Sequence, residues 1–148
     1  MSEDYAAAEE LIMNTFNLRI VASNGVFYDG DCESLVIPAA DGEFGIQANH
    51  EPMVVAIYIG TLRYKTDGEW HTVVTGQGYA RTGGNRTVLI VDSAERPEDV
   101  DEHRAQKAAE RAKELLSVKS SERNYYQGQL AMTRAVVRLK AKKKVNYK

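Results

Sequence analysis

The sequence predicts a β + α protein, with an N-terminal antiparallel β-sandwich followed by a C-terminal antiparallel hairpin of two helices. Between Thr15 and Ser93, short apolar runs alternate with turn residues, which is typical of a sandwich or flattened barrel. After Ser93, Ala and Leu recur every three or four positions in two segments, as in amphipathic helices. We therefore divide the chain into an unassigned N-terminal extension at 1–12, a sandwich at 13–95, and a helical hairpin with a basic tail at 96–148.

The strands are indicated by apolar residues that repeat at every second position. Phe16, Leu18 and Ile20 alternate with polar residues, which is the pattern of a half-buried strand. Asp67-Gly68 separates two strand-like runs and predicts a two-residue hairpin turn. Further strands are expected at 35–37, 62–66, 69–73, 79–81 and 87–91.

The helical region is expected to begin at Pro97, because proline is well tolerated in the first turn of a helix. An apolar stripe runs over 105–116, and residues 117–121 interrupt it. The second helix is expected over roughly 122–141, with residues 142–148 frayed. A short break between two amphipathic helices predicts that they run antiparallel.

The predicted seam of the hairpin is made mostly of alanine. Because a buried CH₂ group contributes only about 0.8 kcal/mol, alanine adds little at each contact. Gly128 lies inside the second helix, where glycine costs about 1 kcal/mol relative to alanine. We therefore expect a weakly docked hairpin of low local stability.

Charge is distributed unevenly along the chain. Residues 1–12 contain four acids and no base, whereas residues 97–148 contain thirteen Lys or Arg and seven Asp or Glu. From Arg123 to the end there are eight basic residues and no acid, which indicates an anionic partner. The longest apolar run, 53–59, is far shorter than the roughly 20 residues that span a bilayer, so we expect membrane association only through a partner.

Four arginines border the alanine stripes: Arg104 and Arg111 on the first helix, and Arg134 and Arg138 on the second. Closing the hairpin would bring these like charges together unless an anion intervenes. A triphosphate suits the bidentate fork of guanidinium groups, and Asp101 could orient Arg104 or accept from a ribose or base. From spacing alone, a solvated charged face with local pairs such as Asp101–Arg104 is the simpler interpretation.

Several segments resemble the epsilon subunits of bacterial F-type ATP synthases. They are Gly42-Glu43-Phe44-Gly45-Ile46, Asn49-His50-Glu51-Pro52, Ile59-Gly60-Thr61-Leu62 and Gly76-Gln77-Gly78-Tyr79, followed by residues 88–95. Their order and spacing match the family from about Met13 to the C-terminus. The resemblance implies a non-catalytic central-stalk subunit that couples rotation and restrains ATP hydrolysis.

The resemblance also implies the partners and the location. The sandwich would dock on the gamma subunit and on the ring of c-subunits, with Glu43 and His50 as candidates for that docking. The C-terminal helices would contact the alpha and beta subunits of the catalytic head. The complex lies on the cytoplasmic face of the bacterial plasma membrane, where this chain would be peripheral.

Some members of this family bind ATP through a motif of the form Ile/Leu-Asp-x-x-Arg-Ala, and Val100-Asp101-Glu102-His103-Arg104-Ala105 is similar to it. The implied regulatory site comprises Glu95, Val100, Asp101, Arg104, Ala105, Arg111, Arg134 and Arg138. Val100 and Gly128 depart from the family pattern, which bears on affinity more than on the site. ATP, alone or with Mg²⁺, would be a regulatory ligand; no obligatory cofactor and no metal site are expected.

The mechanism that the family implies is a population switch of the hairpin. Folded, it would hold ATP among its arginines; extended, its second helix would reach acidic loops of the catalytic head. The cations expected to make that inhibitory contact are Arg123, Arg134, Arg138, Lys140, Lys142, Lys143 and Lys144. The alternative interpretation of the lysine run is a solubilising tail.

Two other classes of function are alternatives to a subunit of the ATP synthase. A nucleic-acid-binding module would use the basic tail, with tyrosines for base stacking. The acidic N-terminal domain and the lack of a recognised nucleic-acid motif argue against it. An independent enzyme is disfavoured because His50, His71 and His103 lack metal-ligand spacing and Cys32 lacks a base. No P-loop is present, so we expect no ATP hydrolysis by the isolated chain.

Overall fold

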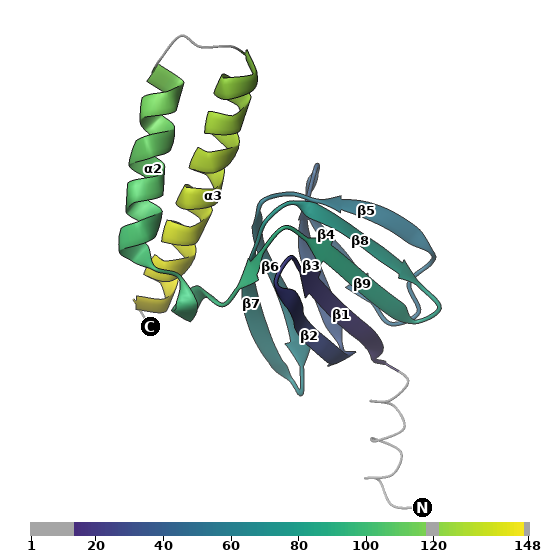
Figure 1. Cartoon of the computed structure of the whole chain (residues 1–148). Coiled ribbons are helices and arrows are strands. Elements are labelled where there is room, and N and C mark those ends of the chain that lie inside the picture. Colours follow the sequence, from purple (N-terminus) through teal and green to yellow (C-terminus); the bar gives the residue numbers. More distant parts are fainter. Residues whose placement is uncertain (1–13, 118–121, 147–148) are drawn as a thin grey trace, which may run out of the picture.

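The computed structural model describes residues 14–117 and 122–146, which form a β-sandwich with a helical hairpin beside it (Figure 1). The predicted extension at 1–12 lies outside the described residues. The strands are β1 (Phe16–Ala22), β2 (Gly25–Cys32), β3 (Ser34–Ala39), β4 (Gly42–Gln47), β5 (Met53–Ile57), β6 (Gly60–Thr66), β7 (Glu69–Thr75), β8 (Gly78–Gly83), β9 (Arg86–Val91) and β10 (Ala94–Glu95). A 3-10 helix, η1 (Pro97–Asp99), precedes the helices α2 (Glu102–Ser117) and α3 (Glu122–Asn146).

The strands form two five-stranded sheets, with orders β2-β1-β9-β8-β5 and β10-β7-β6-β3-β4. The predicted sandwich and the helical hairpin after it are therefore confirmed. One strand pair departs from the predicted antiparallel arrangement, because β1 pairs with β9 in parallel. Parallel neighbours need a long crossover connection, and here the chain between them passes through the other sheet. The sequence pattern of single strands carries no information about such a distant partner.

The core of the sandwich is formed by the inward-facing residues of both sheets. Leu18 and Ile20 on β1 are fully buried, as the alternation in the sequence predicts. The Asp67-Gly68 turn joins β6 to β7, with positive φ values of 52° and 76°. Two positive φ values characterise the two-residue hairpin turns that match strand twist, so this predicted turn is confirmed.

The helix boundaries differ from the predicted ones at both ends. Pro97 begins the separate turn η1, and α2 begins five residues later at Glu102. The expectation that residues 142–148 are frayed is wrong as far as Asn146, where α3 ends. Lysines are good helix formers and stabilise the negative end of the helix dipole, and tertiary contacts of Ala141 and Lys142 hold this last part of α3.

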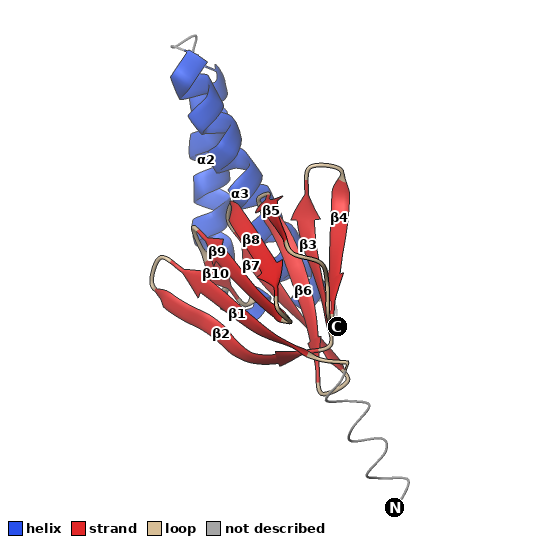
Figure 2. Cartoon of the chain, turned by 90° about the vertical axis from the view of Figure 1, so that its right-hand side faces the viewer, coloured by secondary structure: helices blue, strands red, loops and turns tan. Residues whose placement is uncertain are grey.

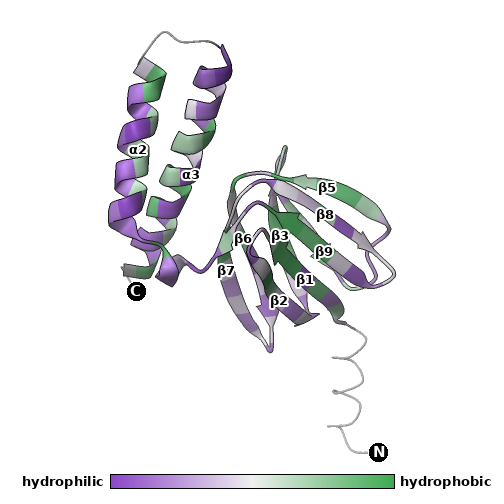
Figure 3. Ribbon diagram, in the orientation of Figure 1, coloured by the Kyte–Doolittle hydropathy of each residue, from purple (hydrophilic) through white to green (hydrophobic). Residues whose placement is uncertain are grey.

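The hairpin contacts the sandwich through the C-terminal half of α3, and its other end points away from the strands (Figure 1). The apolar contact is small, formed by Val74 of β7, Val100, Ala141 and the partly buried Val137. In Figure 2, viewed from the side on which β5 lies, the hairpin is behind the sandwich. Figure 3 shows apolar residues concentrated in the strands and hydrophilic residues over much of both helices. No described helix is long and apolar enough to cross a bilayer.

Candidate functional site

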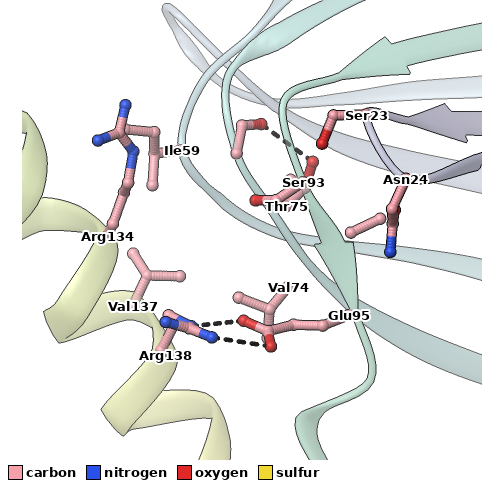
Figure 4. A pocket seen from close by; sticks show the side chains of 12 residues that line it. Ser23, Asn24, Ile59, Val74, Thr75, Ser93, Glu95, Arg134, Val137 and Arg138 are labelled. Atoms are coloured by element: carbon pink, nitrogen blue, oxygen red, sulfur yellow. Dashed lines mark hydrogen bonds and ion pairs between the residues drawn. The ribbon is translucent and has the colours of Figure 1, made fainter. Parts of the chain in front are cut away.

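A cavity of about 410 Å³ lies between α3 and the edge of the sandwich (Figure 4). This volume falls within the roughly 300–1,000 Å³ that is typical of small-molecule sites. Its lining combines cationic, acidic, hydroxyl and aliphatic side chains. The lining residues are Ser23, Asn24, Ile59, Val74, Thr75, Gly76, Ser93, Ala94, Glu95, Arg134, Val137 and Arg138.

An ion pair between Glu95 and Arg138 closes one side of the cavity (Figure 4). Arg138 Nε donates to Glu95 Oε1 at 2.5 Å, and Nη2 donates to Oε2 at 3.0 Å, so the pair is bidentate. Glu95 is fixed to the sandwich because β10 pairs with β7, with Glu95 opposite Val74. The Glu95 side chain is 25% exposed, and the Arg138 side chain is 32% exposed. The hydrogen bonds that Arg138 donates to the Glu95 carboxylate raise the pKa of Arg138 above its ordinary value, although partial desolvation opposes the shift.

Arg134 lies one helical turn before Arg138 and lines the same cavity. It is exposed, and within the described part of the chain no ion pair engages it. The opposite wall carries the hydroxyl groups of Ser23, Thr75 and Ser93. The site therefore presents one free and one paired guanidinium group to a polar wall, an arrangement that suits an anionic ligand bearing hydroxyl groups.

Comparisons with known proteins identify the family to which this chain belongs. The family model for the ATP synthase delta/epsilon chain, β-sandwich domain, matches residues 15–97, and the model for its long α-helix domain matches residues 98–143. An ATP synthase epsilon chain of Ruminiclostridium cellulolyticum is 36% identical over 129 residues, covering 87% of this chain and 96% of the relative. The chain belongs to the epsilon-chain family of F-type ATP synthases.

Other relatives agree with this assignment. The epsilon chain of Caldicellulosiruptor bescii is 38% identical over 128 residues, covering 86% of this chain and 93% of that one. Among solved structures, a chain of the Euglena gracilis mitochondrial ATP synthase matches with a TM-score of 0.73 at 19% identity, covering 90% of this chain and 82% of that chain. At that identity the solved structure supports the fold alone.

Of the eight residues in the predicted ATP site of this epsilon-family chain, three line the cavity: Glu95, Arg134 and Arg138. Arg104 and Arg111 are exposed on α2 and are not part of the lining. Spacing alone could not decide this, because it fixes which side of a helix a residue occupies but not how two helices stand against a sandwich.

The remaining motif residues have structural contacts. The Oδ1 atom of Asp101 accepts the backbone N–H of Arg104 at 3.1 Å and thereby caps the first turn of α2. Val100 is buried in the contact between α3 and the sandwich, and Ala105 is buried completely. Asp101 therefore orients the backbone of Arg104, whereas the sequence had suggested an interaction with its side chain.

The predicted inhibitory cations fall into two groups. Arg138 is paired with Glu95, and Lys142 Nζ donates to the backbone carbonyl of Glu98 at 2.8 Å. The others are exposed along α3: Arg123, Arg134, Lys140, Lys143 and Lys144.

Of the predicted docking residues, Glu43 lies in β4 and His50 lies three residues after the end of that strand. Glu43 is exposed and pairs with Arg63 of β6 at 3.3 Å. The His50 ring packs edge-on against Phe44, with a centroid distance of 5.8 Å.

The sequence analysis missed an apolar surface on the outer side of the sheet β2-β1-β9-β8-β5. Val54, Tyr79 and Ile90 are exposed there, on β5, β8 and β9, and Tyr79 lies directly opposite Ile90. The hairpin packs on the other sheet, through Val74 of β7, and leaves this surface uncovered (Figure 1). In the sequence, each of these apolar residues looks like part of a buried strand. Only the assembled sheet shows which of its two faces is covered. Likewise, no sequence signal marked Ser23, Asn24 and Ser93 as cavity residues.

Proposed function

We propose that this epsilon-family chain couples rotation between the gamma subunit and the c-ring and restrains ATP hydrolysis through its C-terminal helices. The chain itself carries no catalytic step in this proposal. Its location would be the cytoplasmic face of the bacterial plasma membrane, reached through the assembled complex. The family match across both the sandwich and the helices supports this function.

We further propose that the cavity beside α3 binds ATP as a regulatory ligand. The observation that carries this proposal is the convergence of Arg134 and Arg138 on a cavity with a hydroxyl-bearing wall. Guanidinium groups bind phosphate oxygens through two parallel hydrogen bonds, and the cavity is partly shielded from bulk water. Arg104 and Arg111 lie outside the lining, so this site depends chiefly on the arginines of α3.

Binding of ATP would favour the folded hairpin over an extended form. A ligand shifts such an equilibrium only by its preference for one state, and a tenfold preference corresponds to about 1.4 kcal/mol. Among the described residues, the apolar contact between hairpin and sandwich is formed by Val74, Val100, Val137 and Ala141, so a shift of this size is enough to change the balance between the two forms. In the extended form, the cations of α3 would contact acidic loops of the alpha and beta subunits.

The outer apolar surface around Tyr79 and Ile90 is the proposed docking face for the gamma subunit. Exposed apolar patches rimmed by polar residues mark protein interfaces, and this one is continuous across neighbouring strands. Glu43 and His50, near β4, remain the proposed contacts with the c-ring.

Isothermal titration calorimetry with ATP tests the nucleotide site. The native chain is expected to bind, and the double variant Arg134→Ala with Arg138→Ala is expected to lose binding. Arg123→Ala is the matched control, because Arg123 is exposed on the same helix but does not line the cavity. Equal binding by native chain and double variant would exclude this site. Stabilisation by single-stranded DNA, but not by ATP, would favour the nucleic-acid-binding alternative.

A further inference from the structure

We propose that Glu95 is an internal counter-anion that holds the hairpin closed without nucleotide, and that it must release Arg138 before a phosphate group can bind there. This inference rests on the proposed nucleotide site and adds how that site is regulated. Its central element, closure of the hairpin by Glu95, can be measured without any ligand.

The contact occupies the edge of the guanidinium group that a phosphate would use. Arg138 offers Nε and one Nη to the two carboxylate oxygens of Glu95, which is the same fork that binds two phosphate oxygens. A carboxylate and a phosphate cannot both occupy this edge. Binding of a polyphosphate to Arg138 is therefore an exchange of anions.

The contact also joins the two parts of the molecule. Glu95 belongs to β10 and is held in the sandwich by pairing with β7, whereas Arg138 belongs to α3. One turn further along α3, Lys142 donates to the carbonyl of Glu98 in η1, which follows β10 in the chain. Two successive turns of α3 are thus fastened to β10 and η1, which lead from the sandwich to α2.

Arg134 provides the starting point for the exchange. It lines the same cavity and, among the described residues, forms no ion pair that would have to break first. A polyphosphate can bind Arg134 and then displace Glu95 from the neighbouring Arg138. Because Arg138 and Lys142 are also among the cations proposed to inhibit the catalytic head, the closed contact keeps both away from that role.

Distance measurements by double electron–electron resonance on spin-labelled full-length chains test whether Glu95 holds the hairpin closed. Labels at Glu69→Cys on β7 and Lys113→Cys on α2 report whether the hairpin stands against the sandwich; both native residues are exposed. The native Cys32 is buried and will not compete for the label. Without ligand, Glu95→Gln is expected to raise the ratio of open to closed hairpin about tenfold, which is typical for loss of a charged hydrogen-bonded pair.

Glu98→Gln is the matched control, because Glu98 accepts the bond from Lys142 through its backbone carbonyl and the variant keeps that atom. It is expected to leave the closed fraction unchanged. The exchanged pair Glu95→Arg with Arg138→Glu is expected to restore closure without ligand, while losing the response to ATP. Fluorescence of Trp70 on β7 verifies that the sandwich is folded in every variant.

The results separate this inference from the nucleotide proposal. If Glu95→Gln stays as closed as the native chain without ligand, Glu95 does not hold the hairpin, whatever ATP does. If Glu95→Gln opens and the exchanged pair closes, while the native chain fails to bind ATP, the closure by Glu95 stands and the nucleotide site is wrong.

Discussion

Gly128 of α3 lies directly against Leu116 of α2. A Cβ atom at position 128 would be 3.3 Å from Leu116 Cδ2, which is closer than most contacts of real Cβ atoms. Gly128 is also buried, although it lies within a charged, largely exposed helix. The sequence had suggested that this glycine only weakens the helix, but the structure shows that its missing side chain allows the two helices to approach near the tip of the hairpin.

Gly128→Leu is therefore expected to destabilise the hairpin by about 1–3 kcal/mol through overpacking. Leucine is nearly as good a helix former as alanine, so a loss cannot be attributed to helix propensity. Hydrogen exchange of the α3 amides measures the effect. The matched control is Gln127→Leu at the exposed neighbouring position, where the same side chain meets no packed helix. If both variants gave the same protection, close packing at Gly128 would be refuted.

The cap formed by Asp101 gives a second prediction. Asp101→Ala is expected to lower the stability of the first turn of α2 by about 1 kcal/mol, because the backbone N–H of Arg104 loses its acceptor. Asp101→Asn keeps an acceptor oxygen and is expected to retain most of that stability. Hydrogen exchange at the Arg104 amide reports the difference. Asp99→Ala removes a nearby exposed charge and serves as the control. Equal loss in the Asn and Ala variants would show that charge, rather than capping, matters here.

The sequence was sufficient for most of the sandwich because its signals are local. The alternation of Phe16, Leu18 and Ile20 records which side of one strand is buried, and Asp67-Gly68 specifies a turn through its own backbone angles. The parallel pairing of β1 with β9 could not be predicted in the same way. It depends on contacts between segments that are distant in the chain.

The candidate site, like the fold, could be predicted from the sequence only in part. The spacing of Arg134 and Arg138 placed both on one side of α3, and both line the cavity. The pairing of Glu95 with Arg138 and the position of Arg104 outside the lining depend on how α3 meets the sandwich. That packing is set by a few side chains, Val74 and Ala141 among them, which no periodicity in the sequence identifies.

Leu89 and Ile90 are neighbours on β9 that face opposite sides of their sheet. Leu89 is fully buried, whereas Ile90 is 44% exposed on the outer apolar surface. Leu89→Ala is expected to lower the free energy of unfolding by about 2–5 kcal/mol, and Ile90→Ala by less than about 1 kcal/mol. Urea denaturation of the full chain measures both values. Comparable losses would mean that the outer surface supports the fold rather than serving a partner.

Ile90 also tests the proposed gamma-docking face. Ile90→Arg is expected to weaken association with the gamma subunit, because it places a charge in the centre of an apolar contact. Thr72→Arg adds the same charge at an exposed position of the other sheet and is expected to leave association unchanged. Reconstitution with purified gamma distinguishes these results. Unaltered association of Ile90→Arg would rule out this face as the docking surface.

The buried Cys32 thiol provides a prediction about pH. Burial raises its pKa from the ordinary 9.0 to about 11, although hydrogen bonding with the backbone of Ser34 and Lys65 partly opposes the shift. Between these two pH values the unfolded chain has lost the thiol proton and the folded chain has kept it. Stability therefore falls as the pH rises from about 9 to 11, because the folded state binds more protons there.

Urea denaturation of the native chain and of Cys32→Ala, measured between pH 8 and pH 11, isolates this contribution. Tyr64, whose pKa is raised chiefly by burial, is present in both chains, so most of its contribution is common to the two pH profiles. The stability of the native chain is expected to fall more steeply above pH 9 than that of the variant. The same burial predicts that thiol reagents modify Cys32 only when the sandwich unfolds, since the thiolate is the reactive form. If stability depended on pH in the same way in both chains, or if thiol reagents rapidly modified the folded chain, Cys32 would not be a protonated thiol buried in the core.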